Sequence, residues 1–423
     1  MASSTSTKQT RPQKVRLISA AVAATLSLAV PAAMIPLAVL SFGAVNDLPE
    51  YFAGATLSLS GRGASVYKLP ELTSEEHRLF PAMGERAVGL FIPPFSLPLL
   101  LPVALMPPPL APVIWTVLLA LAALVSVLML RKTFQLSLVA TLWLTATACL
   151  SGPLYESLRI GQLAPILLLC LCLAVDQLKQ GKEIKAGLAL AVLLLKPQEL
   201  LPIMLYLIGA AKWKTAGTLL AVGAALVVIS LALPGLDGWR SYIALLGDVS
   251  QNSVYMQPQL SATVRGQLLR VLFLGADFAN LFSLGVLAVT SCFILWSGKR
   301  LRGDLHGLLF LALPLGLLSA LHCHDYDLIL LAPSIVALTK YGPAARIPSY
   351  IVLAAIASAG VFMLPFYITI HYDHLLKGGV INPQFVALLI WSLGLAAFAF
   401  KQMTLPEPMP ESQAATGAQE APL

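Results

Sequence analysis

Residues 305–333 read LHGLLFLALPLGLLSALHCHDYDLILLAP. An almost wholly apolar run, 305–321, is followed by two histidines and two aspartates within six positions, His322 to Asp327, and then by a second leucine-rich run. Ionisable side chains are costly at membrane depth, so a cluster of them in an otherwise apolar segment indicates a candidate functional site. The stretch predicts two membrane helices that meet at a polar, functional turn.

The composition of the whole chain supports this interpretation. Its 423 residues are 58% hydrophobic and only 11% charged, whereas soluble domains contain about 25% charged residues. The sequence therefore predicts an all-α polytopic membrane protein with about 12 transmembrane helices. We expect spans at 17–42, 109–130, 134–150, 215–234, 278–297, 305–321, 328–339, 347–366 and 384–400, and interrupted ones at 161–176 and 184–211.

The two ends of the chain indicate its orientation. Residues 1–16 form a basic arm before an apolar run of 26 residues, which is longer than the 7–15 residues or so of a signal peptide. We therefore expect a retained first helix and a cytoplasmic arm. The segment 17–401 is then one membrane domain, and the Pro-, Ala- and Glu-rich tail 402–423 is predicted to be disordered and cytoplasmic.

The net charge of +7 and the five cysteines indicate no further function. The basic residues cluster in short loops between helices, which is typical of topology determinants and of contact with membrane lipids rather than nucleic acid. The cysteines show no metal-binding spacing and no obvious disulfide pair. We interpret them as small core residues.

Two segments are too polar and too long for simple turns. Residues 43–90 and 235–277 are predicted to be two extracytoplasmic loops with short amphipathic helices, on the same face as His322–Asp327. Two alternatives remain open at this stage. The stretch 91–130 holds two crossings, or one crossing after a re-entrant piece, and 184–211 holds one long helix or two short ones split at Lys196-Pro197.

Asp47 follows the first span almost directly and is the first candidate residue. Asn and Asp favour helix N-caps, so a structural role is one interpretation. A functional role is favoured by Glu50 and Tyr51, which follow on the same loop.

The polar turn at 322–327 is the second candidate. On a helix, His322 and Asp325 would share one face and His324 and Asp327 the opposite face. Asp325 or Asp327 is expected to cap the next helix, whose N-terminus suits a phosphate. The alternatives are interfacial polar residues that satisfy one another, and a metal site, for which the spacing has no specific signature.

Basic residues in other segments provide further candidates. Lys196 interrupts an apolar stretch, beside Gln198, and Arg265 lies on the second outer loop. Each is either a plain interfacial residue or a cation that holds a lipid phosphate. Gln162, in the sequence SGPLYESLRIGQLAP, is a weaker candidate.

The order of the motifs resembles glycosyltransferase family 87 across roughly 40–340. The chain carries an acid after the first span, FIPPF, LMPPPLAPVIW, RIGQLAP, LLLKPQ followed by KWK, GWRSY and HDYDLILLAP, in that order. It departs from the family in the extra histidine of HCHDYD and in FIPPF, where a tyrosine before the two prolines is commoner.

The resemblance implies a membrane fold of the GT-C type and a polyprenyl-phosphate-mannose-dependent mannosyltransferase in the cell membrane. Such an enzyme transfers the sugar with inversion, on the extracytoplasmic face, to a glycan or glycolipid acceptor, and we expect it to need neither metal nor cofactor. By this likeness Asp47 is the base. The donor phosphate is assigned to Lys196, Arg265, His322 and His324, and substrate contacts to Glu50, Tyr51, Gln198, Asp325 and Asp327.

Two rival functions are weighed beside this one. A secondary transporter also has about 12 spans with buried charges, but it usually shows internal repeats and charges near the midplane, whereas these charges gather at one face. A polymerase or ligase of lipid-linked glycans is the other rival.

Overall fold

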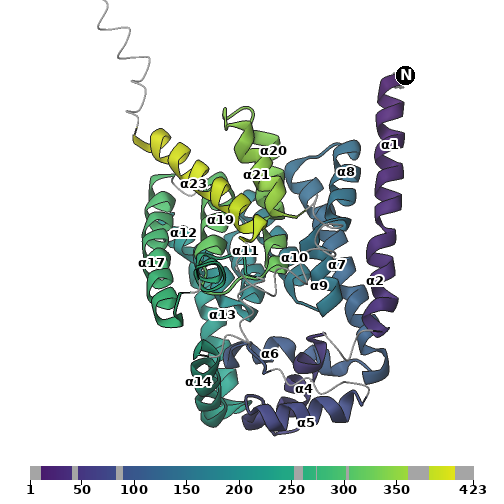
Figure 1. The fold of residues 1–423 in the computed structure, drawn as a ribbon, viewed down its shortest axis with the longest axis vertical. Coiled ribbons are helices and arrows are strands. Elements are labelled where there is room, and N and C mark those ends of the chain that lie inside the picture. Colours follow the sequence, from purple (N-terminus) through teal and green to yellow (C-terminus); the bar gives the residue numbers. More distant parts are fainter. Residues whose placement is uncertain are drawn as a thin grey trace, which may run out of the picture.

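The computed structural model describes residues 11–40, 46–81, 89–251, 261–272, 274–301, 304–360 and 381–404. Within these ranges the chain is built of α-helices, short 3₁₀ helices and one π-helical turn, joined by short connections (Figure 1). The only strand-like pairing there is an isolated antiparallel bridge between Ser261 and His324. The predicted all-α class is confirmed.

Four helical segments among the described residues are long and apolar enough to cross a membrane: Pro12–Pro36, Pro108–Phe134, Trp213–Ala232 and Ala276–Arg300. A fifth is added if α8 (Leu138–Cys149) and α9 (Gly152–Ile160), bent by 52°, form one span. Shorter apolar helices occupy Pro94–Leu105, Leu305–Ser319, Ser349–Ser358 and Pro383–Phe398. The chain is thus a membrane protein, and the total of about 12 spans stays a prediction.

Prolines divide two of the predicted spans. In 184–211, α11 (Glu183–Leu190) and η5 (Ala191–Leu195) end at Lys196, and α12 (Pro197–Gly209) starts afresh. The residue before a proline is pushed away from helical geometry, and Lys196 has φ −134° and ψ 78°. This segment therefore contains two short helices.

The stretch 91–130 begins with short turns and ends in one long helix. The turns are η2 (Pro94–Ser96), α6 (Leu97–Leu100), η3 (Leu101–Leu105) and η4 (Pro108–Leu110), and the long helix is α7 (Ala111–Phe134). Since proline lacks a backbone N–H, the repeated prolines interrupt helical hydrogen bonding. One long helix preceded by short helical pieces is the outcome.

The two predicted outer loops pack against each other. Helices α4 (Leu48–Leu59) and α5 (Leu69–Leu79) lie at one end of the molecule with α14 (Gly235–Gln251), below α13 (Trp213–Ala232) in Figure 1. The rings of Tyr67 and Tyr242 lie 5.1 Å apart. Their hydroxyls donate to the carbonyls of Ile92, at 2.9 Å, and Phe91, at 3.4 Å. Burial raises the pKa of both phenols, that of Tyr242 to about 12.

The opposite edges of the view are formed by α1 (Arg11–Ser27) with α2 (Ala29–Leu40), and by α17 (Ala276–Arg300) (Figure 1). Between them lies α10 (Ala164–Lys179), which packs against α7 and α11. The later part of the chain forms α16 (Val264–Arg270), α18 (Leu305–Gly307), the π-helical η7 (Leu308–Ala312), α19 (Leu313–Ser319), η8 (Asp325–Leu331), α20 (Ala332–Tyr341), α21 (Ser349–Ser358) and α23 (Pro383–Thr404).

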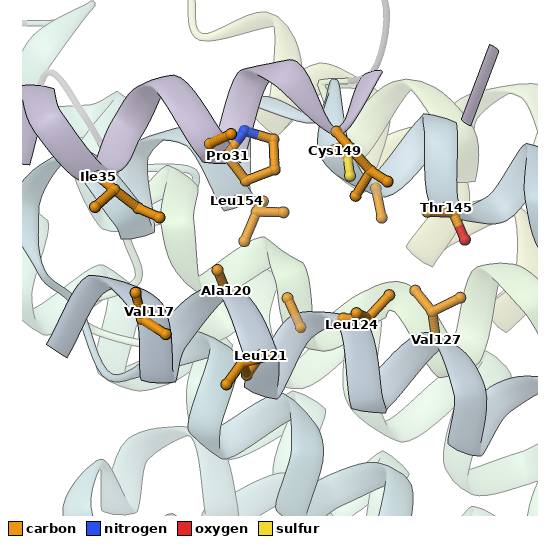
Figure 2. Close-up of a pocket in the computed structure, with 14 residues that line it drawn as sticks. Pro31, Ile35, Val117, Ala120, Leu121, Leu124, Val127, Thr145, Cys149 and Leu154 are labelled. Atoms are coloured by element: carbon orange, nitrogen blue, oxygen red, sulfur yellow. The ribbon is translucent and has the colours of Figure 1, made fainter. Parts of the chain in front are cut away.

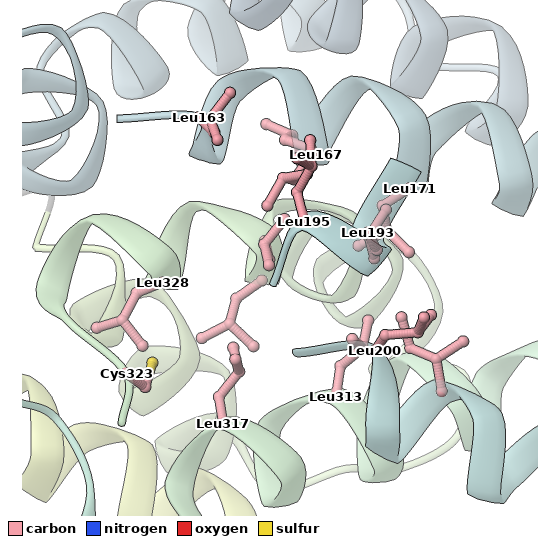
Figure 3. Packing of buried hydrophobic residues seen from close by; sticks show 14 of the residues in the cluster. Leu163, Leu167, Leu171, Leu193, Leu195, Leu200, Leu313, Leu317, Cys323 and Leu328 are labelled. Atoms are coloured by element: carbon pink, nitrogen blue, oxygen red, sulfur yellow. The ribbon is translucent and has the colours of Figure 1, made fainter. Parts of the chain in front are cut away.

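A core of leucines joins α10, η5, α12, α19 and η8 (Figure 3). Four members of this core are direct sequence neighbours of candidate site residues. Leu163 follows Gln162, Leu195 precedes Lys196, Cys323 lies between the two histidines, and Leu328 follows Asp327. Burial of these apolar side chains fixes the backbone beside each polar group. The core thus holds the candidate residues in place.

Several predictions fall on residues that the structure does not describe. These are most of the arm 1–16, most of the tail 402–423, the loop segments 82–88 and 252–260, and the later part of the predicted span 347–366. The domain limits and the orientation in the membrane stay predictions.

Candidate functional site

Asp47 stands directly before α4, but its side chain does not cap that helix. Its neighbour Asn46 does so, because Asn46 Oδ1 accepts the backbone N–H of Leu48 at 2.9 Å. A side-chain oxygen that satisfies a free N–H of the first turn is the usual capping arrangement. Asp47 thus occupies the N-cap position of α4, as the cap interpretation predicted, but its carboxylate makes no capping hydrogen bond.

The Asp47 carboxylate meets the connection between α9 and α10. The backbone N–H of Asp47 donates to the carbonyl of Ile160 at 2.8 Å, and the Gln162 side-chain amide donates to Asp47 Oδ2. Gln162 Oε1 in turn accepts from the Tyr51 hydroxyl at 3.3 Å. Gln162 and Tyr51 are both buried, whereas Asp47 is half-buried. The start of α4 and the end of α9 thus form one polar unit.

This connection is shaped by Gly161 and by Trp115 of α7. Gly161 ends α9 with φ +72°, in the left-handed region that favours glycine. Trp115 Nε1 donates to the Gly161 carbonyl at 2.7 Å, and the Trp115 ring lies 6.3 Å from that of Tyr51. A Cβ at position 161 would lie 2.3 Å from Asn46 Oδ1. The close approach of the two segments therefore requires a glycine.

Lys196 is a buried cation with two acidic neighbours. Its Nζ lies 2.5 Å from Asp327 Oδ1 and 3.8 Å from Glu199 Oε1. The lysine side chain is 12% exposed and both carboxylates are fully buried. The ammonium also lies 4.6 Å from the ring centre of Tyr326, in a cation–π contact. A lysine this buried and this closely paired does not fit the interpretation of Lys196 as a plain interfacial loop residue.

The turn at 322–327 differs from the predicted helix. Residues 320–324 are not helical; η8 begins at Asp325, and His324 is its N-cap. The Asp327 carboxylate, from the third helical position, accepts the His324 backbone N–H at 2.9 Å. The prediction that Asp325 or Asp327 is the N-cap of this helix is therefore wrong. His324 is the N-cap, and the Asp327 side chain accepts the N–H of that residue.

The two histidines lie side by side, not on opposite faces. Their ring centres are 4.3 Å apart, edge to face. The prediction assumed helical rotation between them, which a non-helical segment does not supply. Burial, together with neighbouring His324, holds the pKa of His322 well below its ordinary value. A neutral imidazole contacts a phosphate as an N–H donor, not as a cation.

Arg265 reaches this turn through the second outer loop. The Ala262 N–H donates to the Cys323 carbonyl at 3.1 Å, which ties the start of α16 to the histidine turn. Arg265 is buried, and its Nε donates to Asn280 Oδ1 at 2.6 Å. It is close enough to His322 to influence that imidazole electrostatically.

Asp325 points to another part of the fold. Its Oδ1 accepts from Asn382 Nδ2 at 3.1 Å, at the start of α23. This bond ties η8 to the C-terminal helix. Glu50 is buried one turn after Asp47 on α4, and Gln198 is half-buried on the first turn of α12. Substrate contacts by these three residues stay predictions.

The Asp47 unit and the Lys196 unit belong to one site. Helix α9 packs against η8, and the Tyr326 hydroxyl is close enough to both Asp47 and Asp327 to feel their charges. The structure thus brings together residues from four separate segments. The Asp47 carboxylate lies on one side, and Lys196, which is paired with Asp327, lies on the other with His322 and Arg265. Within the described ranges, no three His, Cys, Asp or Glu side chains converge as metal ligands.

Sequence reasoning undervalued or missed four residues of this site. Gln162 was a weak candidate, and Trp115, Glu199 and Tyr326 were not considered as site residues. Three lie inside quoted motifs: Gln162 in RIGQLAP, Trp115 in LMPPPLAPVIW and Tyr326 in HDYDLILLAP; Glu199 follows LLLKPQ directly. Polar or aromatic residues inside those motifs were the available indication.

An apolar groove lies near the Asp47 unit (Figure 2). It has a volume of about 240 Å³ and runs between α2, α7, α8 and α9. Labelled residues in the figure show aliphatic side chains of Ile35, Leu121 and Leu154 facing it. On α7 its lining begins at Val117, two residues after Trp115.

Comparison with known protein families gives one match. The model of glycosyltransferase family 87 matches residues 91–323, more than half of the chain. The chain belongs to glycosyltransferase family 87. It is accordingly a membrane glycosyltransferase, as the motif order predicted. No curated protein and no solved structure gives a significant match.

The family 87 match covers only part of the site. It contains Trp115, Gln162, Lys196, Arg265 and His322. It begins after Asp47 and ends before His324. The geometry described above is therefore what connects Asp47 and Asp327 to the matched region.

Proposed function

We propose that this family 87 member transfers a hexose, mannose by the sequence resemblance, from a polyprenyl-phosphate donor to an acceptor hydroxyl. The acceptor is a glycan or glycolipid, and the reaction takes place on the extracytoplasmic face of the cell membrane. Both termini are then cytoplasmic, and the membrane domain has the GT-C type of fold. The proposal joins the family to a site in which the Asp47 carboxylate lies near the cations Lys196 and Arg265.

Asp47 serves as the general base in this proposal. Its carboxylate takes the proton from the acceptor hydroxyl, and the acceptor oxygen forms a bond to the anomeric carbon. The bond between that carbon and the phosphate oxygen breaks, and the polyprenyl phosphate leaves with the electron pair. One direct displacement inverts the anomeric configuration. The half-buried Asp47 carboxylate, which Gln162 orients and which makes no capping hydrogen bond to α4, supports this role.

The opposite side of the site stabilises the leaving phosphate. Lys196 and Arg265 supply positive charge, and His322 or His324 supplies an N–H donor. Preorganised donors of this kind act most strongly where water is excluded. Lys196 is held by Asp327 and Tyr326, so its ammonium is positioned before the donor arrives. No metal ion is invoked in this scheme.

The apolar groove between α2, α7, α8 and α9 is our proposed place for the polyprenyl chain. Its lining is almost entirely aliphatic, and it starts within one turn of Trp115, which contacts the Asp47 unit through Gly161 and Tyr51. An apolar chain fills such a groove at no cost in unpaired polar groups.

The observation that carries the proposal is the pairing of Asp47 with Gln162 in the same site as Lys196 and Asp327. The test is a transfer assay with purified protein in nanodiscs, radiolabelled polyprenyl-phosphate-mannose and a membrane extract as acceptor pool. We expect labelled product from the native chain and at least about 10³-fold less from Asp47→Asn, because the base is lost while its shape is kept.

A matched control is Asp237→Asn, an exposed aspartate on α14 that pairs with Arg240 on its own helix. It should transfer at the native rate. Native activity in Asp47→Asn contradicts the base assignment. If mannose is not transferred but another polyprenyl-phosphate hexose or a pentose is, the sugar is corrected; failure with all donors contradicts the proposed function.

A further inference from the structure

We infer that Gln162 is a positioning residue that holds the Asp47 carboxylate in its reactive orientation, with Tyr51 setting the orientation of Gln162. This inference rests on the proposed function, because it assigns a role toward the proposed base. Two hydrogen bonds carry it: Tyr51 hydroxyl to Gln162 Oε1, at 3.3 Å, and Gln162 Nε2 to Asp47 Oδ2.

The chemistry of the two partners fixes which way the Gln162 amide faces. An ionised carboxylate only accepts hydrogen bonds, so the NH₂ group must face Asp47. The amide oxygen then faces Tyr51, whose hydroxyl is able to donate. A reversed amide would set two acceptors against each other, which is costly at a buried site. The chain Tyr51–Gln162–Asp47 therefore has one favourable polarity.

The backbone of Gln162 is fixed independently of its side chain. Trp115 holds the preceding carbonyl, of Gly161, at 2.7 Å, and the Ile160 carbonyl accepts the Asp47 N–H at 2.8 Å. Leu163, on the other side, is a fully packed core residue. The donor thus has a defined position relative to the Asp47 backbone, and the remaining freedom is in the Asp47 side-chain torsions.

Fixing those torsions affects the reaction rate directly. A general base must lie within hydrogen-bond reach of the proton it takes, and small misplacements lower the rate strongly. Asp47 is half-buried, so packing alone restrains it less than a core residue. A neutral amide is suited to this task, because it donates a hydrogen bond and adds no charge to compete with the donor phosphate.

The alternative is that Gln162 only joins α4 to the α9–α10 connection. The two roles differ in what they change. A purely structural role lowers the melting temperature and the amount of folded protein, whereas a positioning role lowers kcat and alters its pH dependence in molecules that are folded. The KM for the donor, which depends on the Lys196 side of the site, should move little in the second case.

The experiment compares Gln162→Ala, Gln162→Glu and the matched control Gln180→Glu in the transfer assay from pH 5 to 9 or so. Gln180 also donates to an aspartate, Asp176, at 2.6 Å, but at the far end of α10. For Gln162→Ala we expect kcat about 10- to 100-fold lower with donor KM within about twofold of native.

The Gln162→Glu variant gives the more specific test of the positioning role. It places a second carboxylate beside Asp47, and like charges disfavour ionisation of both. The acidic limb of the kcat profile should therefore move to higher pH by about one unit or more, while Gln180→Glu leaves the native profile unchanged. Tyr51→Phe should lower kcat less than Gln162→Ala, because the amide still reaches Asp47.

Two results overturn the inference while leaving the proposed function intact. One is native kcat in Gln162→Ala; the other is a Gln162→Glu profile identical to native. Melting curves of the purified variants identify a folding defect, and Gln162→Glu, which keeps the size of the side chain, then carries the decision. If the native chain itself transfers no sugar from any donor, the proposed function fails first.

Discussion

The two ends of α10 each bring a glutamine amide to an aspartate, with different surroundings. At the end near Ala164, Gln162 donates to Asp47. At the end near Lys179, Gln180 donates to Asp176. The helix separates the two pairs by about 20 Å at 1.5 Å per residue. The local chemistry is alike, so the difference between the two aspartates comes from what else surrounds them.

Asp176 is a carboxylate with both oxygens engaged. Thr133 donates to Oδ1 at 3.1 Å, and Lys132 and Gln180 donate to Oδ2 at 3.0 and 2.6 Å. The residue is only 4% exposed. Asp47, in contrast, keeps part of its surface open and lies across a site from Lys196. A buried, satisfied carboxylate stabilises the fold, whereas a half-open, oriented carboxylate suits proton transfer.

Replacing each aspartate by alanine is the strongest way to break this comparison. Asp47→Ala should lower transfer by at least about 10³-fold and leave the melting temperature close to native, because Asn46 still caps α4. Asp176→Ala should cost about 2 kcal/mol of stability by removing charged hydrogen bonds, with native activity per folded molecule. The measurements are transfer rate and melting curve for each variant; the reverse pattern would contradict the assignment.

Asp327 and Glu199, the acidic neighbours of Lys196, allow a similar comparison of two carboxylates on the other side of the site. Asp327→Asn removes the 2.5 Å ion pair and weakens the bond to the His324 N–H, so we expect transfer about 10²-fold lower. Glu199→Gln changes the longer 3.8 Å contact with Lys196 and the contact with Asp327. Because Coulomb attraction weakens with distance, its effect should stay below about tenfold. Donor KM and kcat are measured for both; equal effects would mean that distance to Lys196 does not decide their roles.

His322 supplies the smallest expected effect. Burial and His324 lower the pKa of His322; Lys196 and Arg265 act in the same direction and Asp327 opposes them. The imidazole is therefore neutral above its ordinary value of 6.5, and protonation is confined to lower pH. Donor KM should stay constant between about pH 6.5 and 8. A native KM that rises through this window, but not in His322→Gln, would show a charged imidazole on the phosphate.

The sequence predicts the membrane class, the family and most of the segments that meet at the site. The lengths of the apolar runs and the order of the motifs suffice for these predictions, because both are properties of the sequence alone. It does not predict that Lys196 pairs with Asp327, 131 positions away, or that Gln162 meets Asp47, 115 positions away. Such pairs depend on how α9 and η8 pack, which no spacing along the chain encodes.

Two local predictions also needed information about the backbone path. Asp47 stands at the N-cap position of α4, as residue preference predicts, but the side chain of its neighbour Asn46 accepts the Leu48 N–H instead. The faces assigned to His322 and His324 assumed a helix where residues 320–324 are not helical. In both cases the residue types were right, and the backbone path between them was the missing information.

Gly161 has a consequence for how related chains can vary. A side chain at this position would lie 2.3 Å from Asn46 Oδ1, and its backbone is left-handed. Substitutions at 46 and 161 should therefore be correlated among relatives: a larger residue at 161 should accompany a shorter one, such as serine, at 46. Because Asn46 adjoins the proposed base, such a pair of changes would also alter the setting of Asp47, so the correlation would separate subgroups of the family by the geometry of their acceptor side.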